Sequence, residues 1–214
     1  MIWGEMLAFA LVVFTSFFTL MNPIGIMPVF LKMTENLDDQ ERINTARKAV
    51  LTSFLALMLF AFSGNFLFDF FGISIHGLRM VGGIVFFVMG QDMLNARLAS
   101  SKVRKEDVKT FVRDISITPL AIPMITGPGS ITNAIILMND ANSIEMKITF
   151  VVTIIALMLL ILIILSFAGR LVKFLGETAN TVLMRIMGLI VMVIAIEFFI
   201  AGLKPVIQDI WNIQ

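Results

Sequence analysis

Six apolar stretches dominate the sequence, and each is long enough to cross a lipid bilayer as a helix. A spanning helix needs about 20 mostly apolar residues. The stretches cover roughly residues 6–33, 49–70, 74–94, 115–138, 148–169 and 183–203. Only 14% of the residues are charged, whereas ordinary soluble domains have about 25%. The sequence therefore predicts an all-α polytopic membrane protein with six transmembrane segments.

Charge and cysteine content narrow the classes of partner and chemistry. The net charge is +1 and no basic stripe with interleaved aromatic residues occurs, which argues against a nucleic-acid partner. The absence of cysteine excludes disulfides, thiolate metal sites and cysteine nucleophiles. The single histidine, His76, cannot form a histidine metal cluster, and no zinc-protease motif or Walker loop is present. We expect no enzyme activity, no metal and no cofactor.

Lysine and arginine residues are distributed unevenly among the connections between the stretches. The first, third and fifth connections hold Lys32, Arg42, Arg47, Lys48, Arg97, Lys102, Arg104, Lys105, Lys109, Arg113, Arg170, Lys173 and Arg185, and the others hold Arg79, Lys147 and Lys204. Positive residues accumulate on the cytoplasmic side of a membrane. The odd-numbered connections are therefore predicted to be cytoplasmic and both termini to lie outside the cytoplasm.

The charged connection over residues 97–114 divides the chain into two halves of three stretches each, residues 1–96 and 115–214. Matching residues recur between the halves: Arg79, Gly82 and Gln91 precede Arg185, Gly188 and Glu197 by 106 positions, and Asn22-Pro23 precedes Gly127-Pro128 by 105. Because each half has an odd number of stretches, the second half must be inverted in the membrane. The pattern predicts a 3+3 inverted-topology repeat, as found in many secondary transporters.

The first stretch contains residues that do not continue a helix. Pro23 removes a backbone donor and disfavours helical geometry before it, so we expect Met21 and Asn22 to be extended. A break within hydrocarbon is tolerated only where it is buried in protein or lines a wet cavity. With Asn22 as N-cap and Pro23 as the first helical residue, a second half-helix is predicted to start near the midplane and run to about Met33.

The fourth stretch contains a similar break in the sequence ITPLAIPMITGPGSITNAI. Two prolines strain its first half, and Gly127-Pro128-Gly129 cannot continue a regular helix. Gly127 is expected to be the N-cap and Pro128 the first helical residue of another half-helix, over residues 130–138. By the inverted symmetry, both half-helix N-termini are expected to approach each other near the midplane.

These two N-termini form a predicted binding site for a small polar solute. A helix N-terminus presents free N–H groups and about half a positive elementary charge, which suits a carboxylate or a phosphate. The candidate substrate-binding residues are Thr19, Met21, Asn22, Pro23, Ile24, Gly25, Thr126, Gly127, Pro128, Gly129, Ser130 and Asn133. The alternative is that each motif is a structural kink, since prolines commonly kink transmembrane helices.

Two acidic residues are candidates for carrying a coupling proton. Glu197 is the only ionisable residue well within the sixth stretch, where a charge is costly. A neutral carboxylic acid bonded to a neighbouring helix is the alternative for Glu197. Asp92 lies near the end of the third stretch, where an interfacial role is the alternative.

Three classes of function fit these features. Inverted repeats with a closed central site favour a carrier that works by alternating access. Broken helices also line pores, so a channel for small polar solutes is one alternative. A structural or regulatory membrane protein without transport activity is the other.

The motif NPIG followed by Pro28, together with PLAIP and GPGSIT, resembles the signature segments of the MarC family of bacterial and archaeal membrane proteins, and the resemblance covers essentially the whole chain. It implies a protein of the cytoplasmic (inner) membrane in the neutral amino acid transporter group, with small substrates such as glycine and alanine. The binding region then falls on residues 22–25 and 126–130. The ammonium group of such a solute needs acceptors, for which the Asn22 side chain, threonine hydroxyls and the carbonyls of Met21 and Thr126 are candidates.

Overall fold

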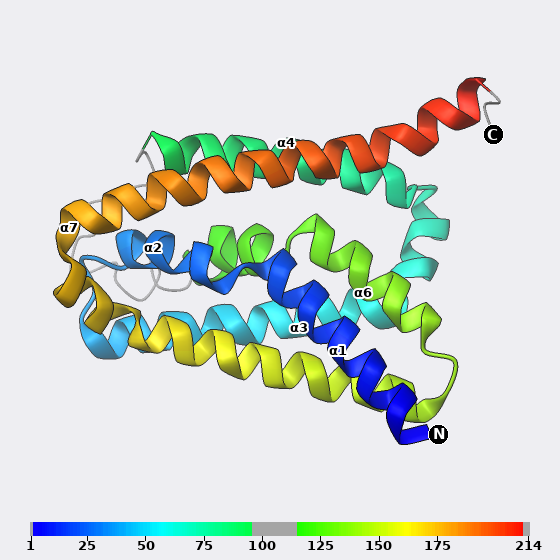
Figure 1. Ribbon diagram of the computed structural model, residues 1–214, viewed down its shortest axis with the longest axis horizontal. Helices are drawn as coiled ribbons and strands as arrows, with labels where there is room; N and C mark the ends of the chain where they lie inside the picture. The colour runs from blue at the N-terminus through cyan, green and yellow to red at the C-terminus, as the bar shows by residue number, and fades with distance from the viewer. Residues whose placement is uncertain (1, 96–114, 212–214) are drawn as a thin grey trace.

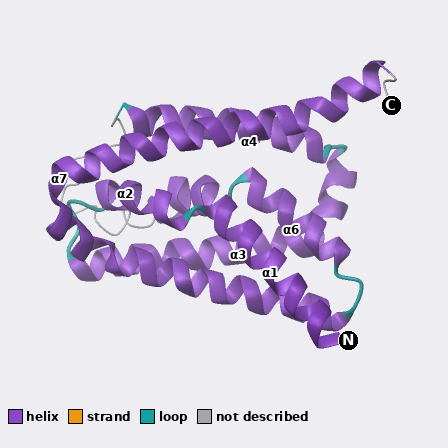
Figure 2. Ribbon diagram, in the orientation of Figure 1, coloured by secondary structure: helices purple, strands orange, loops and turns teal. Residues whose placement is uncertain are grey.

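The computed structural model describes residues 2–95 and 115–211 (Figure 1). Within these ranges the chain forms helices joined by loops and no strand, as Figure 2 shows. The predicted all-α class is therefore confirmed for the described part of the chain. The charged connection over residues 97–114 lies outside the described residues.

The described residues form seven helical elements. They are α1 (Ile2–Met21), α2 (Pro23–Met33), α3 (Asp39–Phe71), α4 (Ile75–Leu94), the π-helical segment η2 (Ser116–Ile125), α6 (Pro128–Asp140) and α7 (Ile144–Trp211). Five candidate spans are long and apolar enough to cross a membrane, and the pair of η2 and α6, bent by 58°, would make a sixth. The chain is thus built as a multi-pass membrane protein.

Two helices extend beyond the apolar stretches that predict them. The second stretch begins near residue 49, but α3 begins at Asp39 because a capping box stabilises its N-terminus. The Asp38 carboxylate accepts a hydrogen bond from the Glu41 amide at 2.7 Å, and the Glu41 carboxylate accepts one from the Asp38 amide at 3.1 Å. The fifth and sixth stretches both lie in the element α7, whose two candidate spans are Ile144–Ala168 and Thr181–Trp211, and the chain reverses direction between them (Figure 1).

The helices form two long antiparallel pairs with the broken elements between them (Figure 1). One pair is α3 with the first half of α7, and the other is α4 with the second half of α7. The elements α1, α2, η2 and α6 lie between the pairs (Figure 1). Of these, α6 contacts both α3 and α4, η2 contacts α3, and α1 and α2 contact α7. The start of α1 and the end of α7 lie at one end of the molecule, and the connection from α2 to α3 lies at the other (Figure 1).

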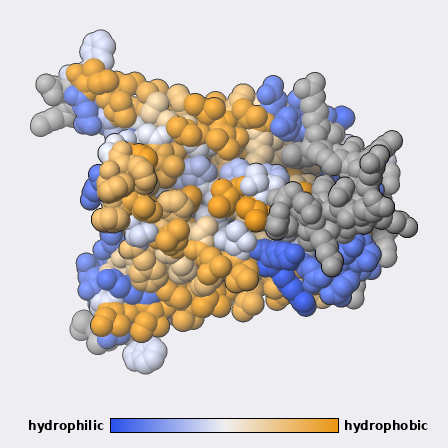
Figure 3. All heavy atoms as spheres, turned by 180° about the vertical axis from the view of Figure 1, so that it is seen from behind, coloured by the Kyte–Doolittle hydropathy of each residue, from blue (hydrophilic) through white to orange (hydrophobic). Residues whose placement is uncertain are grey.

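The outer surface of the molecule is apolar over most of its length. Figure 3 shows a wide band of apolar residues between two hydrophilic ends. Large side chains such as Leu55, Phe62, Leu159 and Val193 are exposed on this band. A soluble domain rarely exposes so large an apolar area, so this band is the surface that faces the lipid.

Glycine residues bring the backbones of α4 and α7 into direct contact. A methyl group added at Gly83 would lie 2.6 Å from the carbonyl oxygen of Ala195, and one added at Gly90 would lie 2.8 Å from the carbonyl oxygen of Gly188. Small residues permit this close approach in membrane proteins, where helix association depends on van der Waals packing. The α4–α7 pair is therefore a tightly packed unit.

We expect Gly188→Ala to destabilise the protein, because the new methyl group would lie 2.7 Å from the Leu94 amide nitrogen and 2.8 Å from the Gly90 carbonyl oxygen. The cost should be about 1–3 kcal/mol, typical of overpacking. Thermal unfolding in detergent measures it. Gly4→Ala is the matched control, because a methyl group there meets nothing within 4 Å. Equal unfolding temperatures for the two variants would contradict the close packing.

Candidate functional site

The first apolar stretch changes from one helix to the next at Asn22. The chain leaves α1 at Met21 and enters α2 at Pro23, and Asn22 adopts the left-handed conformation with φ 41° and ψ 64°. The Asn22 side-chain oxygen Oδ1 accepts a hydrogen bond from the Gly25 amide at 3.2 Å. The predicted N-cap and the proline in first helical position are confirmed.

The expectation of extended geometry at Met21 and Asn22 is wrong. Proline restricts only the residue directly before it, so Met21 stays helical, and the Asn22 amide continues α1 by donating to the Phe18 carbonyl at 3.0 Å. Asn22 leaves the helical region by turning left-handed, which asparagine tolerates better than most residues. Its carboxamide then packs on Gly25, where a methyl group would lie 2.8 Å from the Asn22 Cγ.

The second break has the same order of residues but a different cap. In η2, Thr118 and Ile122 have extended backbone angles, and each precedes a proline through a cis peptide bond. Gly127 is extended, with φ −79° and ψ 170°, and Pro128 is the first residue of α6. The predicted cap position is therefore confirmed. No side chain caps α6.

The two helix starts differ in the backbone amides that they leave free. In the first turn of α2, the Gly25 and Ile26 amides donate to the Asn22 side chain and carbonyl, which leaves the Ile24 amide. In the first turn of α6, the Ile131 amide donates to the Gly127 carbonyl at 2.9 Å. The Gly129 and Ser130 amides have no hydrogen bond to the described part of the chain. The α6 start therefore has the larger unmet donor capacity.

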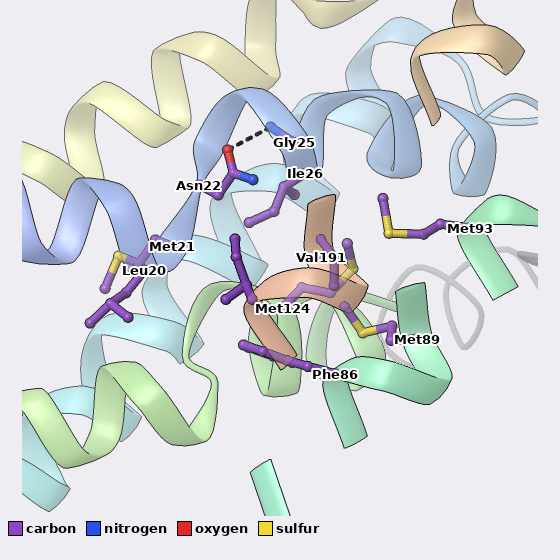
Figure 4. A pocket seen from close by; sticks show the side chains of 11 residues that line it. Leu20, Met21, Asn22, Gly25, Ile26, Phe86, Met89, Met93, Met124 and Val191 are labelled. Carbon is purple, nitrogen blue, oxygen red and sulfur yellow. Dashed lines mark hydrogen bonds between the residues drawn. The ribbon is translucent and has the colours of Figure 1, made fainter. Parts of the chain in front are cut away.

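A cavity of about 40 Å³ lies against the first break (Figure 4). It is lined by Leu20, Met21, Asn22, Gly25, Ile26, Phe86, Met89, Met93, Met124, Val191 and Ile194. A water molecule needs about 10–15 Å³ measured in this way, whereas sites for drug-sized ligands measure about 300–1,000 Å³. The cavity therefore has room for a few water molecules and is closed to an amino acid in this conformation.

Part of the predicted site lines the cavity. Met21, Asn22 and Gly25 line it, and Pro23 is buried next to them. Thr19 and Ile24 are exposed and lie outside it. The only lining residue from the chain segment before the second break is Met124.

The polar residues of the second break make bonds to other helices. The buried Thr126 hydroxyl donates to the Ser53 carbonyl in α3 at 3.0 Å. The Asn133 side-chain amide donates to the Ser16 hydroxyl in α1 at 3.0 Å. The Ser130 hydroxyl donates to the Ile125 carbonyl at 3.4 Å. In this conformation these side chains hold the broken segment in place.

Aromatic rings cover the start of α6. A methyl group added at Gly127 would collide with the edge of the Phe86 ring, and one added at Gly129 would collide with the Phe198 ring. The two rings meet edge to face, with centroids 6.2 Å apart. Since Phe86 also lines the cavity, its ring lies between the cavity and Gly127.

The two candidate coupling residues do not line the cavity. Glu197 is exposed on α7, and Asp92 is half-buried near the end of α4. Ile194, which lies one helical turn before Glu197 on α7, lines the cavity.

Several lining residues are missing from the predicted site. They are Phe86, Met89, Met93, Met124, Val191 and Ile194. The first three share one helix face at spacings of three and four residues, which is the available sequence signal. That signal does not distinguish them, because every spanning helix of this chain repeats apolar residues at such spacings.

We expect Asn22→Ala to destabilise the protein more than Ser74→Ala, which removes the N-cap of α4 at an ordinary backbone conformation. Loss of a cap costs about 1 kcal/mol, and a left-handed alanine adds about 1–2 kcal/mol. Asn22→Gly should lie between wild type and Asn22→Ala, because glycine accepts the conformation but lacks the cap. Thermal unfolding in detergent gives the order. A Ser74→Ala effect as large as that of Asn22→Ala would refute this account.

Comparison with known proteins identifies the family of this chain. The model of the MarC family integral membrane proteins matches residues 7–207. The chain is 37% identical to the UPF0056 membrane protein YvbG of Bacillus subtilis over 202 residues, covering 93% of this chain and 96% of that protein. It is 34% identical to the UPF0056 membrane protein YhcE of Escherichia coli over 201 residues, covering 93% and 94%.

An archaeal protein has comparable similarity. The chain is 35% identical to a UPF0056 membrane protein of Pyrococcus abyssi over 200 residues, covering 94% of this chain and 96% of that protein. No solved structure matches the chain. The family match extends over both breaks, the cavity-lining residues and all or most of each candidate span, and it confirms the resemblance to the MarC family. The chain belongs to the MarC family of integral membrane proteins.

Proposed function

We propose that this protein is a secondary transporter of small neutral amino acids, such as glycine and alanine, that works by alternating access. The observation that carries the proposal is the position of the cavity. Asn22 and Gly25 of the first break form part of its wall, and Phe86 connects that wall to Gly127 of the second break. A solute in this cavity would contact the start of α2, with the Phe86 ring between it and the start of α6.

The free groups at the breaks suit a carboxylate. Because the Asn22 Oδ1 accepts from the Gly25 amide, the side-chain Nδ2 hydrogens are the donors that remain at the cavity wall. The free Ile24 amide adds a donor at the positive end of the α2 dipole, whereas the free Gly129 and Ser130 amides belong to the start of α6, against which the Phe86 ring packs. For the ammonium group, the carbonyls of Met21 and Thr126, the Thr126 hydroxyl and the second lone pair of Asn22 Oδ1 are the proposed acceptors.

A structural repeat supports the inverted topology that alternating access requires. Asn22 and Gly127, the residues between helices, are 105 positions apart, as are the first helical residues Pro23 and Pro128. The next helix start repeats the spacing. The Ser143 hydroxyl accepts from the Met146 amide at 3.2 Å, 105 positions after the matching bond between Asp38 and Glu41. We infer two three-span halves of opposite orientation, with half-helices that start near the midplane.

The arrangement of the termini supports a location and an orientation. The start of α1 and the end of α7 lie at one end of the molecule, opposite the Lys- and Arg-bearing connection from α2 to α3. The positive-inside rule then assigns that connection to the cytoplasm and the termini to the outside. Together with the bacterial relatives, this supports the cytoplasmic membrane as the location.

The size of the cavity favours a carrier over a channel. At about 40 Å³ it is too small for glycine or alanine until helices or side chains move. A carrier passes through such closed conformations in every cycle. An open path through the protein would instead be expected of a conducting channel.

In proteoliposomes, we expect saturable counterflow of labelled glycine and alanine. Asn22→Ala should weaken apparent affinity by about 10- to 100-fold, because a hydrogen bond to a charged group contributes about 1.5–3 kcal/mol. Ser74→Ala, at a cap outside the cavity, is the control and should leave transport unchanged. A complete lack of flux for both solutes would reject the substrate class, and flux proportional to concentration without counterflow would favour the channel.

Glu197 is the proposed site of proton coupling, because it is the ionisable residue of the last candidate span closest in sequence to the cavity residue Ile194. In Glu197→Gln, we expect uptake driven by a pH gradient to be lost while counterflow continues, since glutamine cannot titrate. Asp92→Asn is the comparison variant. Unchanged gradient-driven uptake in Glu197→Gln would remove this residue from the coupling mechanism.

A further inference from the structure

One side of the cavity is closed by a single rigid side chain, that of Phe86. The ring is 8% exposed and lies across the cavity from Asn22 in Figure 4. The edge of the ring lies close to Gly127: a methyl group added at Gly127 would be 2.8 Å from the Phe86 ring atom Cε1. The space between the cavity and Gly127 is therefore filled by this ring.

The rest of the cavity wall is apolar and adaptable. Away from Asn22, the wall consists largely of methionine and aliphatic side chains, among them Met89, Met93, Met124 and Ile194. Methionine has three rotatable bonds and adapts to differently shaped neighbours. Such a wall accepts an apolar group but does not set a sharp limit on its size.

Phe86 has no comparable freedom. Its ring packs edge to face against Phe198, with an interplanar angle of 79°, and Phe198 in turn lies against Gly129. The Phe86 ring therefore cannot move towards α6 without displacing the backbone at Gly127 or the Phe198 ring. It forms a fixed end wall of the cavity.

We propose that Phe86 is the specificity-determining residue of the transport site. A solute whose carboxylate binds at Asn22 directs its side chain into the apolar compartment, and the Phe86 ring limits the length of that side chain. The ring thereby selects small amino acids over larger apolar ones. This inference rests on the proposed function, since it concerns the substrate range of the same site.

The first test is a selectivity measurement in proteoliposomes with glycine, alanine, valine and leucine. We expect Phe86→Ala to raise the ratio of leucine to alanine transport by about 10-fold or more, because a single methylene in an apolar pocket changes selectivity about 10- to 200-fold. Phe86→Leu should give an intermediate ratio and serves if the alanine variant does not fold.

Phe17→Ala and Phe17→Leu are the matched controls. Phe17 is also buried and forms an edge-to-face pair, with Phe150 at 5.9 Å, but it does not line the cavity. These variants should keep the wild-type ratio. An unchanged ratio in active Phe86 variants, or an equal change in the Phe17 variants, would overturn the inference.

A second measurement does not depend on transport. Because the chain has no cysteine, Ser130→Cys provides a single thiol at the start of α6, where Ser130 is 2% exposed. We expect a small methanethiosulfonate reagent to label this thiol faster when Phe86→Leu is added, and not when Phe17→Leu is added. Equal labelling rates would show that the ring is no barrier. If wild type transports none of the four amino acids, the proposed function fails while this measurement still decides whether Phe86 closes the cavity.

Discussion

The pairing of backbone N–H and C=O groups in an apolar environment is the constraint on which this structure depends. Long helices satisfy it along α3, α4 and α7, and each interruption needs a local solution. At the first break, Asn22 turns left-handed and its side chain replaces a missing helical acceptor. At the second, Gly127 offers no side chain, and the Gly129 and Ser130 amides have no acceptor in the described part of the chain. An unpaired buried donor costs about 1–3 kcal/mol, so a bound anion or water at this helix start would stabilise the protein.

Close packing then determines which groups can occupy the space around the breaks. Glycines allow the α4 and α7 backbones to touch, and glycines at positions 127 and 129 leave room for the edges of two phenylalanine rings. The glycine residues therefore have two structural roles. Along α4 and α7 it holds two helices together, and at the start of α6 it brings aromatic rings against a helix terminus. The cavity is the space that remains beside the first break.

The sequence predicted the features that depend on local chemistry. Proline at the first helical position, Asn22 and Gly127 as caps, and the apolar spans all follow from backbone rules and hydropathy. The extent of α3 was not predicted, because hydropathy marks the part of a helix that crosses the membrane and not its ends. The lining residues Phe86, Met93 and Met124 were missed for another reason. A membrane helix carries apolar residues on its inner and lipid-facing sides, so periodicity does not identify the inner side.

The two breaks are also attached to the fold in different ways, and this difference bears on movement. The first is capped by its own side chain, and its hydrogen bonds lie within residues 18 to 26. The second is held by neighbours: Thr126 bonds to α3, Pro128 packs on Gly82 of α4, and Phe198 of α7 packs on Gly129. A displacement of the α4–α7 pair relative to α3 would pull these contacts in different directions and change the second break, while the first break would keep its shape. The start of α6 is thus the break that is held by both helix pairs, with the Phe86 ring between it and the cavity.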